Sequence, residues 1–315
     1  MKQTNNQWIK DALLYGAIFI ILLFTVSFLP VVGIFLLVVL PVPLSIFTYK
    51  HGYKKGLVLG GLILVSTLIF AFNFFFLSLP LTLLAILSGG AVGESVRRGR
   101  HPYETLVHGT AFYMIGFMIL MAALEFVMGI HLATEYRLLI QDSLLQSQQM
   151  METVGVTLSE SELAAVKEQM LVVLDVIPAL MLITSAVMSL ILQWLTFKLL
   201  NRLEKRKLFF PAIRRFNLPK SIIWLFLVVL LLSLISYPEG SMFANILMNV
   251  SLLIGLLFSM QGLSFIFYYL HKKRQPKTLA IVLTVIAIII LPVGLYVTRI
   301  LGIIDIGFMM RKRLK

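Results

Sequence analysis

The chain has 315 residues, of which 59% are hydrophobic and 13% are charged, and its formal net charge is +13. Soluble domains are about half apolar and about a quarter charged, so this composition excludes a soluble globular protein and predicts an all-α membrane protein. The absence of cysteine excludes disulfides and thiolate metal sites. The positive charge lies in loops between apolar runs, where it meets anionic lipid headgroups, so we do not expect nucleic acid as a partner.

The apolar runs are long enough to cross a bilayer several times. A membrane-spanning helix needs about 20 predominantly apolar residues. Nine runs approach that length, the fourth and seventh being the shortest: 12–29, 31–47, 56–75, 77–92, 106–130, 171–197, 222–236, 243–269 and 278–297. We therefore predict a polytopic transmembrane helical bundle of about 8–10 spans.

The loop charges orient these spans. The most basic loop, 198–220, holds eight Lys and Arg residues and one acid. It shares its side with four other loops, and the five together hold twenty Lys and Arg residues: 1–11, 48–55, 93–105, 198–220 and 270–277. The loops on the other side hold two, Arg137 and Lys167. Short basic loops stay cytoplasmic, so we expect a multi-pass protein with a cytoplasmic N-terminus.

The basic tail RKRLK at 311–315 conflicts with nine spans, which would place it outside. Either the tail lies outside against the charge rule, or the segment 295–310 turns back after Pro292-Val293-Gly294, a motif that can break a helix. We favour the return. A returning segment must bury Arg299 and Asp305, so we expect these two residues to pair inside the bundle.

The long loop 131–170 predicts a helical arm on the outer side of the membrane. Its acidic balance suits that side, and its residue types favour helix. VGVT at 154–157 divides it, after which Ser159 and Glu162 form a capping box, with Leu158 and Leu163 as a hydrophobic staple. We expect the two helices to continue the fifth and sixth spans. A plain helical extension and a lid or partner-docking arm stay open as interpretations.

Small residues at intervals of four mark faces where helices approach closely. Such stripes occur in the third, fourth and eighth spans: Gly52, Gly56 and Gly60; Gly89 and Gly93; Ser251, Gly255 and Ser259. In lipid, small residues let two backbones pack. We interpret them as packing within the chain, with docking of another membrane subunit as the alternative.

Polar side chains inside the spans are the candidates for ligand binding. Glu125 is either a functional carboxylate or a side chain that reaches water at the outer edge of its span. Asn245 and Asn249 share one face of the eighth span, which also holds Gln261. Amides in lipid either join helices or line a cavity. We predict that these four residues contact a small molecule.

Motifs typical of enzymes are absent from the sequence, including HExxH, GxSxG, the P-loop and paired DxD aspartates. The glycine-rich SGGAVGESV at 88–96 lacks the Lys-Ser/Thr that follows a phosphate-binding loop. We therefore expect no catalytic residue, no cofactor and no metal site. A transport role would then use a gradient, a partner ATPase or no energy source.

Three C-terminal segments, together with MKQT at the start, resemble a known family: FPAIRRFNLPKSIIW at 210–224, MQGLSFIFYYLHKK at 260–273 and LGIIDIGFMMRKR at 301–313. They are similar to the YybS-like family of uncharacterised bacterial polytopic membrane proteins, and Asp305 and Arg311 fall in its C-terminal pattern. That family is loosely grouped with the S-components of energy-coupling-factor transporters, which bind a vitamin or similar molecule while a separate ATPase drives release. The resemblance implies a bacterial cell membrane.

We interpret the chain as a single integral membrane domain, 1–315. It comprises the first five spans (1–130), the arm (131–170), and the remaining spans with the basic tail (171–315). The favoured function is a transporter-like or substrate-binding membrane subunit for a small molecule. The resemblance to the S-components implies that this protein would then have a membrane partner subunit. The alternative is a membrane scaffold or regulator that docks partners through the arm and the basic loop 198–220.

Overall fold

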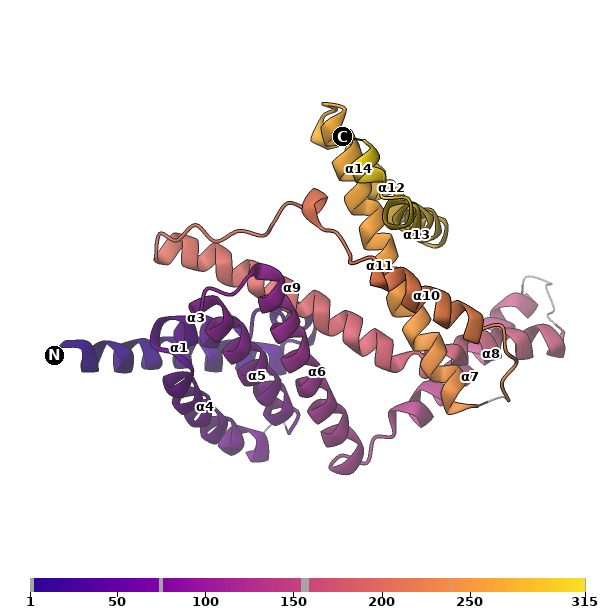
Figure 1. The fold of residues 1–315 in the computed structure, drawn as a ribbon. Coiled ribbons are helices and arrows are strands. Elements are labelled where there is room, and N and C mark those ends of the chain that lie inside the picture. The colour runs from indigo at the N-terminus through magenta and orange to yellow at the C-terminus, as the bar shows by residue number, and fades with distance from the viewer. Residues whose placement is uncertain (1–2, 74–75, 154–158, 239, 315) are drawn as a thin grey trace. The chain divides into compact units, whose positions relative to one another are not determined.

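The computed structural model describes residues 3–73, 76–153, 159–238 and 240–314, and these residues form helices and connecting turns without a strand (Figure 1). Within them, six helices are long and apolar enough to cross a membrane: α1 (Gln3–Phe28), α4 (Tyr53–Asn73), α5 (Ser78–Arg97), α6 (Pro102–Phe126), α9 (Ile177–Leu203) and α11 (Met242–Lys272). The all-α polytopic fold is therefore confirmed.

The chain forms two compact units, where the sequence predicts a single domain. The first unit comprises Met1–Met170 and Leu180–Phe210. The second comprises Leu171–Ala179 and Pro211–Lys315. Each unit has a hydrophobic core of its own.

The first unit is organised around α3 (Val42–His51), whose residues from Val42 to Thr48 are all buried. A helix buried on every side must be covered by other helices, and α1, α4 and α5 pack against it (Figure 1). Phe47 is fully buried and meets the Tyr15 ring of α1 edge-on. The Ser45 hydroxyl lies 3.1 Å from that of Thr196 on α9, which gives this core a polar contact.

Glycines on α5 and α4 make the close packing around α3 possible. A methyl group on Gly89 would lie 2.5 Å from the Pro41 carbonyl oxygen, and one on Gly93 would collide with the Ser45 carbonyl. Gly56 and Gly60 of α4 face the side chains of Thr48 and Ile86 in the same way. Gly52 has a different role, because its φ of +84° ends α3.

The sixth predicted span, 171–197, is interrupted at Val176, and two more predicted spans are not continuous helices. The second, 31–47, divides into α2 (Pro30–Leu36) and α3, separated by a turn that contains Pro41. The ninth, 278–297, breaks at Ile290 between α12 (Lys277–Ile289) and α13 (Leu291–Gly307), just before Pro292. Proline lacks an amide hydrogen and clashes with the preceding turn, which accounts for both breaks. The seventh predicted span is the 12-residue α10 (Ser221–Leu232), and α12 has 13 residues.

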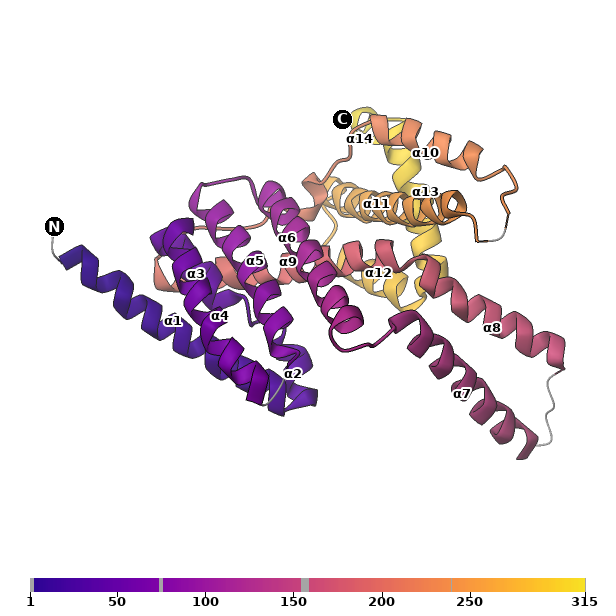
Figure 2. The same cartoon turned by 90° about the horizontal axis from the view of Figure 1, so that it is seen from below.

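The predicted arm consists of α7 (Leu132–Thr153) and α8 (Glu160–Asp175) (Figure 2). The capping box is confirmed: the Ser159 N–H donates to Glu162 Oε2 at 2.9 Å, and the Glu162 N–H donates to Ser159 Oγ at 3.3 Å. Leu158 and the VGVT segment lie outside the described residues. The arm helices do not continue the membrane helices, because Gly129 at φ +66° turns the chain between α6 and α7 and Val176 separates α8 from α9.

The second unit is built on α11, which α13 crosses (Figure 2). Gly262 and Gly302 lie at the crossing, where a methyl group on either would collide with a backbone carbonyl of the other helix. Phe258 is fully buried in this unit and packs edge-on against Phe226 of α10. The chain ends in α14 (Met310–Arg313), and a short 3₁₀ helix, η1 (Ile213–Arg215), packs on α11.

Candidate functional site

A cavity of about 340 Å³ lies beside α3 in the first unit, lined by α3, α4, α5 and α6. Its walls are mainly apolar and include Leu44, Leu57, Ile86, Leu87 and Phe112. Polar side chains also line it: Thr48, Glu94, Ser95, Arg98, Arg100 and His108. Ligand sites in proteins combine such apolar walls with a few polar groups. We call this space the α3 cavity.

The α3 cavity exists partly because Gly90 has no side chain. No atom lies within 4 Å of the place where a Gly90 Cβ would be, whereas its neighbours Gly89 and Gly93 contact the backbone near α3. Successive residues of a helix point about 100° apart. Gly90 therefore lies off the packing stripe and leaves space instead of closing a helix contact.

The charged residues of the α3 cavity are held by neighbouring helix ends. Glu94 accepts hydrogen bonds from the Tyr53 N–H at 3.1 Å and from Arg98 Nε at 2.8 Å. His108 Nδ1 donates to the Glu104 carbonyl at 2.7 Å, so its Nε2 is free to accept from Arg100. The cavity thus has one end that carries guanidinium, carboxylate and imidazole groups.

Thr48 is the polar group of the α3 cavity with an unmet hydrogen bond. It is 1% exposed, and its hydroxyl has no hydrogen-bond partner in the part of the chain that the structure describes. Buried hydroxyls without a partner are uncommon because they lose their hydrogen bonds to water. This hydroxyl packs against Gly56 of α4, and Thr48 forms part of the cavity wall.

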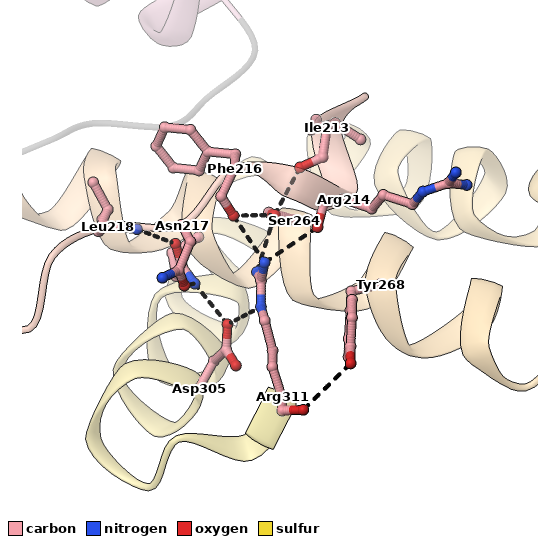
Figure 3. Close-up of polar contacts among 10 residues, drawn as sticks. Ile213, Arg214, Phe216, Asn217, Leu218, Ser264, Tyr268, Asp305 and Arg311 are labelled. Atoms are coloured by element: carbon pink, nitrogen blue, oxygen red, sulfur yellow. Dashed lines mark hydrogen bonds and ion pairs between the residues drawn. The ribbon is translucent and has the colours of Figure 1, made fainter. Parts of the chain in front are cut away.

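The second unit contains a polar cluster that joins the C-terminus to the segment before α10 (Figure 3). Arg311 donates from Nε to Asp305 Oδ2 at 2.8 Å and from its terminal nitrogens to the carbonyls of Arg214 and Phe216 and to Ser264 Oγ. The Tyr268 ring lies beside the guanidinium, 5.3 Å from its carbon. Arg311 therefore holds three separate segments of the chain together.

Gln261 completes this cluster. Its amide nitrogen donates to Asp305 Oδ2 at 2.6 Å and to Asn217 Oδ1 at 3.0 Å, and its oxygen accepts from the Leu218 N–H at 2.9 Å. We predicted Gln261 as a ligand-binding residue, but the protein itself occupies its hydrogen-bonding groups. Asp305 pairs with Arg311 and not with Arg299, which corrects the expected partner.

Asn245 and Asn249 hold the junction between α8 and α9. Asn249 accepts from the Ala179 N–H at 2.8 Å and donates to the Asp175 carbonyl at 2.6 Å. Asn245 donates to Asp175 Oδ1 at 3.1 Å. These bonds match the interpretation in which the amides join segments of the protein. Glu125 belongs to the first unit and lies at the exposed end of α6, with His131 Nδ1 3.7 Å from its carboxylate.

The four predicted ligand-binding residues are divided between the units: Glu125 is in the first, and Asn245, Asn249 and Gln261 are in the second. The residues that line the α3 cavity were not predicted. Thr48, Arg98, Arg100 and His108 lie in predicted loops or at span ends, where charge is expected on topological grounds. The sequence held one clue to the α3 cavity. Close helix packing explains Gly89 and Gly93 but does not explain why residue 90 is also a glycine. No group of three His, Asp or Glu residues that could hold a metal occurs among the described residues.

Comparison with known proteins agrees with this architecture. Residues 17–306 match the family described as "Predicted membrane protein (DUF2232)". The chain belongs to the DUF2232 family. A DUF2232 relative, the "Uncharacterized protein YybS" of Bacillus subtilis (strain 168), is 30% identical over 329 aligned residues and covers 100% of both chains. No solved structure matches this DUF2232 chain. The resemblance to YybS-like multi-span membrane proteins is thereby confirmed.

Proposed function

We propose that this protein binds a small molecule in the α3 cavity, either as a transporter or as the substrate-binding subunit of one. The observation that carries the proposal is a buried, unpartnered Thr48 hydroxyl in a largely apolar cavity with charged groups at one end. A molecule with an apolar body and a polar end matches those walls. The role proposed is binding, without catalysis.

The loop charges support a direction for the cavity. Its charged residues Glu94, Arg98 and Arg100 belong to the loop 93–105, which the charge rule places on the cytoplasmic side. The loop 48–55, on the same side, supplies the uncharged lining residues Thr48 and Tyr53. We propose that the N-terminus is cytoplasmic, that the membrane is a bacterial cell membrane and that the charged end of the cavity faces the cytoplasm. By the resemblance to S-components, a separate membrane subunit and ATPase would drive release.

Affinity purification in mild detergent, followed by mass spectrometry of proteins and small molecules, tests this function. The expected result is a bound metabolite in stoichiometric amount, or a co-purifying ATPase with its coupling subunit. Recovery of non-transport membrane partners without a small molecule would contradict it.

A membrane scaffold or regulator is the second candidate, and the arm favours it. On α7, Leu138, Leu139, Leu145 and Met150 are exposed by 50%, 61%, 50% and 72%. Exposed apolar side chains in such a group are typical of a surface that binds another protein. Deleting 140–165 separates the two functions, because a scaffold would lose its partner whereas a transporter would keep its ligand.

A further inference from the structure

The second unit has a cavity of its own, of about 420 Å³, which is distinct from the α3 cavity and from the function proposed for it. Residues of α11, of α13 and of the chain that follows α10 line it. Its polar groups are Ser233, Tyr237, Ser251 and Arg299, and its walls include Leu247 and Leu252. We call it the Arg299 cavity.

The charge of Arg299 is not neutralised within the described chain. Its Nε is buried and has no hydrogen-bond partner, and its guanidinium lies directly against Gly255 of α11. The described carboxylates of this unit are engaged elsewhere: Asp305 with Arg311 and Asp175 with Asn245. Arginine stays protonated in proteins, so a positive charge faces this cavity without a counter-ion from the described residues.

Gly255 places this charge deep within a membrane helix. It lies 13 residues after Met242 and 17 before Lys272, which corresponds to roughly 20 and 26 Å along the helix. The hydrocarbon core of a bilayer is about 30 Å thick, so Gly255 lies near its middle when α11 spans. Ionisable groups at that depth generally face a ligand or ion pathway. Lipid phosphates lie at the membrane surface, which favours a dissolved anion over a headgroup.

The hydroxyl groups around Arg299 fit the same ligand class. Ser251 lies one helical turn before Gly255, on the same face of α11, and lines the cavity; its hydroxyl makes no hydrogen bond within the described chain. Ser233 and Tyr237 donate their hydroxyl hydrogens to the carbonyls of Val229 and Leu232. The free donors of the cavity are therefore the guanidinium and the Ser251 hydroxyl, and an oxyanion accepts from both.

We propose that the Arg299 cavity binds a small organic anion, a carboxylate or a phosphate monoester. The oxyanion would accept hydrogen bonds from Arg299 and Ser251, and the apolar part of the ligand would pack on Leu247 and Leu252. Gly255 has a specific role in this site, because a side chain there would displace the guanidinium.

The test uses the full chain in phosphatidylcholine nanodiscs, with benzoate and phenyl phosphate as probes and the neutral benzamide as the matched control. A ligand that binds the folded state raises the melting temperature in a saturable way. We expect at least one of the two anions to do so and benzamide to have no effect. Absence of a shift with both anions would overturn the proposal.

Three variants locate the binding. Arg299→Gln removes the charge, Ser251→Leu fills the cavity while leaving Arg299 in place, and Arg313→Gln removes an exposed charge of the same unit. The first two should weaken anion binding about tenfold or more, as expected for loss of a charge-assisted hydrogen bond, and the third should leave it unchanged. If Arg299→Gln does not fold, Ser251→Leu decides; unchanged binding in that variant would refute the site.

Two further arms separate the sources of the anion and the two cavities. In nanodiscs that contain phosphatidylglycerol, a dissolved anion should still raise the melting temperature. If anionic lipid alone stabilises the protein through Arg299 and abolishes the benzoate effect, the occupant is a lipid headgroup and the proposal of a dissolved anion is wrong. Gly90→Phe, which fills the α3 cavity, should leave unchanged the rise in melting temperature that the anion causes. The test of the Arg299 cavity therefore does not depend on whether the α3 cavity binds a ligand.

Discussion

Arg311 of α14 and Asp305 of α13 form an ion pair of 2.8 Å between Nε and Oδ2, with side-chain exposures of 16% and 1%. The same guanidinium reaches the carbonyls of Arg214 and Phe216, so the pair anchors the chain's end to the segment before α10 (Figure 3). A buried carboxylate is tolerated only when it is paired or hydrogen-bonded. The polar cluster therefore determines where the basic tail lies within the second unit.

The ion pair predicts strong coupling between its two partners. Arg311→Leu should lower the free energy of unfolding by about 3–5 kcal/mol, because it leaves the Asp305 carboxylate buried without its cation. The double variant with Asp305→Leu should cost less than the sum of the two single changes. Unfolding in mixed micelles measures this, with the exposed Arg313→Leu as the control. Additive single effects would show that the pair does not act as a unit.

Two neighbouring glycines of α5 should respond oppositely to the same substitution. Gly93→Ala should destabilise the protein by about 1–3 kcal/mol, because the new methyl group meets the Ser45 carbonyl. Gly90→Ala should be neutral or stabilising by up to about 1 kcal/mol, since no atom lies within 4 Å of its Cβ position and alanine favours helix. Thermal unfolding of the two variants in one detergent compares them. Equal destabilisation would contradict the existence of the α3 cavity at Gly90.

Asn249 and Glu125 should differ in their effect on stability although both are polar residues of membrane helices. Asn249→Ala should cost about 1–2 kcal/mol, because it removes the hydrogen bonds to Ala179 and Asp175. Glu125→Gln should change stability little, because that side chain is 55% exposed. Limited proteolysis at the α8–α9 junction, combined with thermal unfolding, measures both. A stable, protease-resistant Asn249→Ala variant would show that this amide does not hold the junction.

The beginning of α8 should depend on pH. Hydrogen bonds from the backbone N–H and the hydroxyl of Ser159 lower the pKa of Glu162 below its ordinary value. The carboxylate therefore stabilises the cap fully above the ordinary carboxyl pKa, and this contribution is lost as the pH falls through the lowered pKa. Hydrogen exchange of α8, corrected for the intrinsic pH dependence, should show protection lost in that acidic range. Glu162→Gln should remove this pH dependence. If the variant and the wild type show the same dependence of α8 protection on pH, the prediction is wrong.

The long helices were predictable because length and hydropathy alone determine them. The predicted spans 106–130 and 243–269 correspond closely to α6 and α11. Two apolar runs are divided into separate helices by the breaks at Pro41 and Ile290. Hydropathy did not predict these breaks, because proline interrupts the helix backbone while leaving the run apolar. The structure accordingly describes six long helices instead of nine spans.

The functional sites were less predictable because they depend on tertiary partners. Arg311 was recognised only as part of a family pattern, since nothing local shows that it meets Asp305. Asn249 was recognised as polar, but only the position of Asp175 distinguishes helix joining from cavity lining. The α3 cavity results from a missing side chain at Gly90, and an absence of atoms leaves no hydropathy signal.

The most direct test of small-molecule binding compares two glycine variants of the first unit. Gly90→Phe places a ring in the α3 cavity, whereas Gly61→Phe, also free of contacts within 4 Å, places one on an exposed face of α4. Both proteins are purified from cells under identical conditions, checked for folding, and extracted for mass spectrometry of bound small molecules. We predict that the wild type and Gly61→Phe carry the same molecule and that folded Gly90→Phe lacks it. Equal amounts in all three proteins, or none in the wild type, would contradict the proposed function.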